Sequence, residues 1–265
     1  MSRLLAWLDR KSFLGFQVWD FSCRSFFLEY GRLFLARVLL RHPARFVRGL
    51  CAYRRVVRSR PDLAGRYDQS LAIPDDACVA AALLQAGPPP LVGVGFCLKP
   101  NDPSDAALTC PSGHANHECQ FLQAGATAGA CSRCLIHAIA QRCLRARCRV
   151  YVMTSARDIA ADFLLPQADR GSFPSAILLL CPYSVQAILP ALLICNIDSL
   201  LIAYGKGYCR DFREWLRADR GIKDEQTSLE PHLARELFAA LERRAAAVSP
   251  ASAFERRGNI FEPAG

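Results

Sequence analysis

The spacing of hydrophobic and polar positions changes along the chain at three consecutive prolines, residues 88–90. Before them, aromatic and aliphatic side chains recur at intervals of three and four between arginines, which is typical of amphipathic helices. We therefore expect residues 1–60 to be helical, with an interruption at Pro43. A further helix is expected to begin at Asp75 and Asp76 and to end near Gly87.

After the prolines, short runs of Val, Leu and Ile alternate with helical stretches. The predicted strands are residues 91–97, 149–154, 176–180 and 199–204, and the predicted helices are residues 132–147, 155–165, 184–194 and 227–248. This alternation predicts an α/β fold, a parallel sheet with helices on both faces, preceded by an N-terminal helical segment. The expected division is a basic helical region 1–88, a cysteine-rich α/β domain 91–248 and a loose tail 249–265.

Positive charge is concentrated at the N-terminus. The net charge is +9, and residues 1–66 carry fourteen Arg and Lys against four Asp and Glu. A basic, aromatic-rich helical segment can lie on an anionic membrane surface, so residues 1–60 are a candidate for such contact. The alternative is a helical hairpin that packs on the main domain with solvated arginines. No nucleic-acid motif accompanies the charge, so no specific nucleic acid is predicted.

Two features bear on location. The apolar run at the start of the chain ends at Asp9, which argues against a secretory signal. Residues 171–197 carry no charge, but their three prolines favour a strand, a loop and a helix over a membrane span. We expect a cytoplasmic protein, with peripheral membrane contact as the open question. In a reducing compartment, clustered thiols bind metal or do redox chemistry more often than they cross-link.

Seven of the thirteen cysteines are predicted to meet at one edge of the sheet. Cys97 lies at the end of one predicted strand, Cys181 directly follows another, and Cys209 follows a third after a glycine-rich turn. The carboxyl ends of parallel strands lie together, and the loop before residue 131 leaves from the same edge. The candidate metal ligands are Cys97, Cys110, Cys119, Cys131, Cys134, Cys181 and Cys209. The other six, at positions 23, 51, 78, 143, 148 and 195, are expected to be ordinary buried residues.

Three kinds of chemistry fit these thiols. An iron–sulfur cluster is bound by about four cysteine thiolates that lie in loops, often next to a proline, as in Cys110-Pro and Cys181-Pro. Zinc is the alternative, in a binding module without catalysis, and His114 and His117 lie close in sequence with their roles open. The third is a metal-free thiol enzyme that uses Cys181 or Cys209. A redox or sulfur-related role would involve an unidentified redox or protein partner. No dinucleotide fingerprint or nucleophile elbow occurs.

Several short motifs follow one another in an order that resembles the domain-of-unknown-function 116 family. They are Phe96-Cys-Leu-Lys-Pro100, Cys110-Pro-Ser-Gly113, Cys131-Ser-Arg-Cys-Leu-Ile136, Val150-Tyr-Val-Met-Thr-Ser155, Leu180-Cys-Pro182 and Gly207-Tyr-Cys209. The resemblance covers residues 91–215 and implies an α/β core in which the cysteines of these motifs recur; it implies no reaction. The family has a further cysteine three residues before its CxxC, where this chain has Ala128. Cys119 is the candidate to replace it.

Overall fold

The computed structural model describes residues 28–59, 70–73, 88–102, 104–223 and 225–264. Their strands form one seven-stranded sheet in the order β1-β5-β4-β2-β3-β7-β6. The strands are β1 (Ser70–Ile73), β2 (Leu91–Gly95), β3 (Arg149–Met153), β4 (Ser175–Leu180), β5 (Asp198–Ala203), β6 (Phe254–Arg257) and β7 (Ile260–Pro263). The four central strands are mutually parallel, and antiparallel strands border them on both sides.

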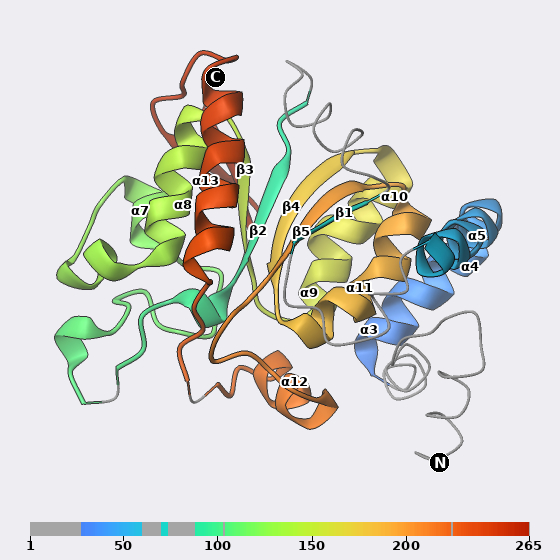
Figure 1. Cartoon of the computed structure of the whole chain (residues 1–265), viewed down its shortest axis with the longest axis horizontal. Helices are drawn as coiled ribbons and strands as arrows, with labels where there is room; N and C mark the ends of the chain where they lie inside the picture. Colours follow the sequence, from blue (N-terminus) through green and yellow to red (C-terminus); the bar gives the residue numbers. More distant parts are fainter. Residues whose placement is uncertain (1–27, 60–69, 74–87, 103, 224, 265) are drawn as a thin grey trace.

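Helices cover both faces of the sheet, as predicted (Figure 1). One face carries α7 (Gln120–Ala124), α8 (Leu135–Arg145) and α13 (Pro231–Ala245). The other carries α9 (Ala156–Ile159), α10 (Leu165–Arg170) and α11 (Pro182–Cys195), and the N-terminal helices α3 (Glu29–Gly31), α4 (Arg37–Arg41) and α5 (Pro43–Ser59). Beyond the carboxyl end of β5 lies α12 (Phe212–Asp219).

Side chains from successive strand positions enter opposite cores, as the pleat of a strand requires. On β3, Val150 and Val152 pack with α8 and α13, whereas Tyr151 and Met153 pack with α9 to α11. All five positions of β2 are buried. The central strands therefore read as continuous apolar runs rather than as alternating ones, since both of their faces are covered.

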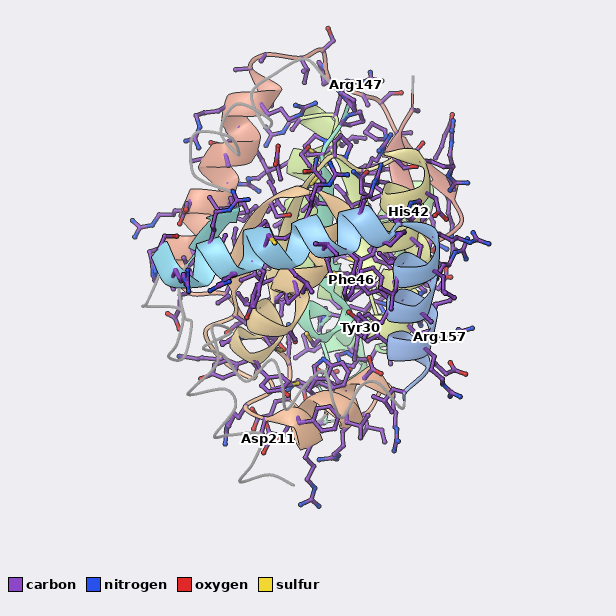
Figure 2. The ribbon with its side chains drawn as sticks, turned by 90° about the vertical axis from the view of Figure 1, so that its right-hand side faces the viewer. Tyr30, His42, Phe46, Arg147, Arg157 and Asp211 are labelled. Carbon is purple, nitrogen blue, oxygen red and sulfur yellow. The ribbon has the colours of Figure 1, made fainter. Side chains whose placement is uncertain are left out.

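The uncharged segment 171–197 is β4 followed by α11. This helix is apolar nearly all round because it lies between the sheet and α5, which crosses over it (Figure 2). The two helices approach closely at Gly49, where a Cβ atom would lie 2.4 Å from the Cα of Ile194. Among the described residues, no helix has both the length and the apolar character that crossing a membrane requires.

The predicted N-terminal helical segment is present from residue 29 to residue 59, and it packs against the main domain. Arg37 and His42 hold Asp169 of α10 at 3.1 and 2.8 Å. Residues 1–27 and the helix predicted at 75–87 lie outside the described residues. The prediction of a loose tail is wrong: residues 254–263 form the β6–β7 hairpin, and β7 pairs with β3.

The two middle strands separate at their carboxyl ends. Pairing between β2 and β4 stops at Gly93 and Leu178, although each strand continues to pair with its outer neighbour. The chain places β3 on one side of β2 and then crosses to place β4 on the other. This reversal is the topological switch point at which open α/β sheets form ligand crevices.

One side chain fills the gap between the separating strands. The Tyr204 hydroxyl accepts a hydrogen bond from the N–H of Gly95 at 2.9 Å and donates one to the carbonyl of Leu179 at 2.8 Å. A Cβ atom at Gly95 would lie 2.8 Å from that hydroxyl, so glycine is required for this approach. The Gly95 N–H and the Leu179 carbonyl, which lose their partners where β2 and β4 separate, are thus hydrogen-bonded to the Tyr204 side chain. This bridge fixes the shape of the opening.

Candidate functional site

The seven predicted cysteines form two groups rather than one. The first group comprises Cys110, Cys119, Cys131 and Cys134, which line one small cavity of about 20 Å³. Cys119 immediately precedes α7, Cys131 lies in a 3₁₀ turn, and Cys134 is the N-cap of α8. Cys119 therefore shares a cavity with both cysteines of the CxxC motif. This proximity is necessary if Cys119 takes the place of the cysteine that the resembled family has at position 128, where this chain has alanine.

Backbone N–H groups reach three of these four thiols. The N–H of Ala128 donates to the Cys131 sulfur at 3.4 Å. Burial raises the pKa of Cys134 to about 11, and the N–H groups at the start of α8 act in the opposite direction. Burial likewise raises the pKa of Cys119, against N–H groups of α7. Such N–H groups favour the thiolate, which is the form that binds metal.

A buried lysine lies beside the four thiols. Lys99 is only 1% exposed, and its Nζ donates to the carbonyls of Gly113 and Asn116 and to the Asn116 side-chain oxygen, at 2.6 to 3.0 Å. All three acceptors are neutral. Burial lowers the pKa of Lys99, while the neighbouring Cys110, Cys119 and Cys134, and to a smaller extent Glu118, act in the opposite direction. Among the described residues, no carboxylate forms an ion pair with this ammonium group.

The three histidines near the cysteines differ in their surroundings. His137 lines the four-cysteine cavity and bonds the Cys131 carbonyl through Nδ1 at 2.9 Å, but its buried Nε2 has no hydrogen-bond partner within the described chain. His114 packs edge-on against Phe96, and neither of its buried ring nitrogens is paired there. His117 lies apart from the thiols and bonds the Val152 carbonyl at 2.7 Å.

The second group comprises Cys97, Cys181 and Cys209, at the carboxyl ends of β2, β4 and β5 as predicted. They line a cavity of about 110 Å³ at the switch point, with Tyr204 and Trp215. Most of its other lining residues are apolar, and Asp219 and Lys223 supply charge. Burial raises the pKa of Asp219.

Two thiols of this group interact directly. The Cys209 N–H donates to the Cys181 sulfur at 3.3 Å. A side-chain hydrogen bond from Cys181 lowers the pKa of Cys209, an effect that Lys223 reinforces, and the same hydrogen bond raises the pKa of Cys181. Burial raises the pKa of Cys97 to about 11, although a side-chain hydrogen bond with Thr227 opposes it. Cys209 is thus the more readily ionised member of a hydrogen-bonded pair.

The loop that carries Cys209 is clamped by the segment before α13. The Thr227 N–H donates to the Cys97 carbonyl at 2.9 Å, and its hydroxyl donates to the Gly207 carbonyl at 3.2 Å. Gly207 has a φ of +63°, and a Cβ there would lie 2.3 Å from the Gln226 carbonyl oxygen. Only glycine suits this turn, which carries Cys209 back over the sheet edge.

The remaining cysteines are placed mostly as predicted. Cys143, Cys148 and Cys195 are buried in the cores. Cys51 is exposed on α5, so the prediction that it is buried is wrong, because its face of the helix points away from α11. Cys23 and Cys78 lie outside the described residues. As the side chains stand in the described chain, no three His, Cys, Asp or Glu residues are placed to hold a metal ion. Ligation by the four-cysteine group therefore requires the thiols to rotate towards one another.

Sequence reasoning missed Lys99, Tyr204 and Thr227. Lys99 lies within the Phe96–Pro100 motif, and a lysine four residues after the end of the buried strand β2 was the available signal. In comparisons with known proteins, no family model, no curated protein and no solved structure matches the chain. The resemblance to the domain-of-unknown-function 116 family therefore stays a prediction.

Proposed function

We propose that the protein binds an iron–sulfur cluster through Cys110, Cys119, Cys131 and Cys134 and has a redox or sulfur-related role. The observation that carries the proposal is the buried ammonium of Lys99 beside four thiols that line one cavity. A buried charge without a directly paired counter-charge costs several kcal/mol. Among the described residues Glu118 acts on Lys99 without forming an ion pair with it. A metal centre held by four thiolates carries net negative charge, and that charge would offset the cost.

The donor set fits such a centre. All four cysteines lie in loops, in a short 3₁₀ turn or at the start of a helix, and Pro111 follows Cys110, as is common around iron–sulfur clusters. The N–H of Ala128 already reaches one sulfur. His137 donates through Nδ1 to the Cys131 carbonyl, which leaves the lone pair of Nε2, unpaired within the described chain, as a further candidate metal ligand at the cavity wall. When bound, the cluster would supply one-electron redox chemistry, and hydrogen bonds to its sulfurs would set its potential.

Zinc is the second candidate, and the size of the cavity favours it. The free space is about 20 Å³, whereas a single water needs about 10–15 Å³ on this measure. Four thiolates can surround one ion in so little space, whereas a multinuclear cluster needs the loop between Cys110 and Cys134 to widen. Zinc would make the site structural, so that chelation unfolds the loop.

Substitutions test the proposal. The protein is purified anaerobically, and iron, acid-labile sulfide and zinc are measured per chain. Cys119→Ala is expected to lose the metal. The control variants Cys51→Ser, at an exposed site, and Cys195→Ala, in the opposite core, are expected to retain it. Equal metal content in Cys119→Ala and the controls, with all variants folded, would contradict the assignment of ligands.

A second test addresses Lys99. A buried cation favours the more negative, reduced state of a cluster, so Lys99→Met is expected to lower the reduction potential. The potential is measured by optical redox titration of anaerobic protein. A merely structural lysine would change stability and leave the potential unmoved, and that result would remove Lys99 from the site.

A further inference from the structure

Cys97, Cys181 and Cys209 lie outside the proposed metal centre. They gather where β2 and β4 separate, in a cavity of about 110 Å³. An apolar cavity of about 150 Å³ accepts benzene, so this one has room for a group of a few carbon atoms. The cavity is mostly lined by apolar side chains, including Met153, Ile188 and Trp215.

The three thiols are not equivalent. Cys97 is engaged by Thr227, whereas Cys181 and Cys209 share a side-chain hydrogen bond. The Cys209 backbone N–H reaches the Cys181 sulfur at 3.3 Å. Two cysteines in such contact are within reach of a disulfide after small rotations about Cα–Cβ. The clamp at Thr227 holds one of them in a fixed turn.

We propose that Cys181 and Cys209 form a redox dithiol that reduces the disulfide bond of a small, largely apolar molecule bound in this cavity. The Cys209 thiolate attacks one sulfur of that disulfide, forms a mixed disulfide and expels the other sulfur as a thiolate. The Cys181 sulfur then attacks the Cys209 sulfur, releases the second thiolate and leaves a Cys181–Cys209 disulfide.

The exchange is balanced without a further reactant. The bound molecule gains two electrons and becomes two thiols, which take the proton of Cys181 and one proton from water. The protein dithiol loses the same two electrons. An external dithiol restores it by the reverse sequence of exchanges.

Cys209 is the attacking residue for two reasons. It is the member of the pair whose ionisation is eased by the hydrogen bond from Cys181, and Lys223 lies at the same cavity. Thiol–disulfide exchange proceeds through the thiolate, so the more ionised thiol reacts first. Cys181, whose sulfur lies next to the Cys209 N–H, then serves as the resolving thiol.

The experiment uses the full chain and the small neutral disulfide dimethyl disulfide in less than stoichiometric amount. Peptide mapping by mass spectrometry under non-reducing conditions is expected to find a Cys181–Cys209 disulfide as the main product. Cys181→Ser is expected to trap the methylthio group on Cys209. Cys209→Ser is expected to slow consumption of the probe by about tenfold or more, while Cys51→Ser leaves it unchanged.

The proposal is overturned if the wild-type protein reacts first at the exposed Cys51, or if its disulfide joins other cysteines. Because the disulfide is mapped in the wild-type protein, the test remains valid even where a variant fails to fold. The result is distinguishable from that of the metal test, because a Cys181–Cys209 disulfide uses none of the four proposed metal ligands and metal content is measured separately.

Discussion

The opening between β2 and β4 depends on a contact between Gly95 and Tyr204, and a double-mutant cycle tests it. Gly95 has φ −71° and ψ 142°, a conformation that alanine adopts without strain. Alanine would therefore stabilise the protein by about 0.4–1 kcal/mol through the unfolded chain if nothing opposed it. Its Cβ, however, would lie 2.8 Å from the Tyr204 hydroxyl.

That distance requires the strand or the tyrosine to move. Overpacking of this kind costs about 1–3 kcal/mol, so Gly95→Ala is expected to destabilise the protein by about 1–2 kcal/mol net. Tyr204→Phe leaves the Gly95 N–H and the Leu179 carbonyl without their partner. Each unsatisfied buried group costs about 1–3 kcal/mol, so roughly 2–6 kcal/mol is expected in total.

The double variant separates the contact from the other effects. Without the hydroxyl, the nearest tyrosine atom would be the ring carbon at 3.7 Å, an ordinary contact. The alanine should then cost nothing, and the double variant should be about as stable as Tyr204→Phe alone. The remaining neighbour of the new Cβ, the Cys97 sulfur at 3.1 Å, can rotate away.

Urea unfolding followed by circular dichroism measures the four free energies of unfolding. The expected coupling energy is about 1–2 kcal/mol, with the double variant more stable than the sum of the single changes predicts. If the two changes add to within about 0.5 kcal/mol, the Tyr204 hydroxyl does not fill the gap between the strands, and the described shape of the crevice is wrong.

Three further predictions concern the N-terminal helices. Gly49→Ala should cost about 3 kcal/mol in urea unfolding, because a Cβ would lie 2.4 Å from the backbone of α11, and a loss under 1 kcal/mol would contradict the close packing. A hydrogen bond from His42 lowers the pKa of Asp169, so Asp169→Asn should reduce the free energy of unfolding by about 0.5–1 kcal/mol at neutral pH. This difference between the variant and the wild type should vanish as the pH falls through the lowered pKa of Asp169. A difference that persists in acid would refute an ionic origin. Leu40 is 81% exposed on the basic N-terminal helices, so Leu40→Asp should weaken co-sedimentation with anionic vesicles severalfold. The control Ile222→Asp, at an exposed site away from these helices, should leave co-sedimentation unchanged. Equal binding by both variants would show that the surface around Leu40 does not contact the membrane.

The sequence was most informative where local pattern decides structure. Buried runs such as 176–180 predict central parallel strands, because both faces of these strands are covered. Parallel strands then place Cys97, Cys181 and Cys209 at one edge without further information. The division of the seven cysteines into two cavities could not be predicted in this way. It depends on the path of the loop after β2, which is fixed by long-range contacts such as Lys99 to Asn116.

The terminal hairpin was missed for a different reason. Strand β6 reads Phe254-Glu-Arg-Arg257 and borders the sheet, so its side chains are mostly exposed and carry no hydrophobic signal. Only Ile260 and Phe261 of β7 are buried, too few to mark a strand. The Gly258-Asn259 pair was the available signal, since this dipeptide suits a two-residue hairpin turn, and Gly258 has a φ of +64°.

The most direct test of the proposed metal centre is metal analysis of the anaerobically purified full chain. Bound iron, acid-labile sulfide and visible charge-transfer absorption are expected, and Cys119→Ala should abolish all three. Stoichiometric zinc that is lost in the same variant would assign the four thiols to a structural zinc site instead. Folded wild-type protein that holds neither metal after anaerobic reconstitution would contradict the metal centre altogether.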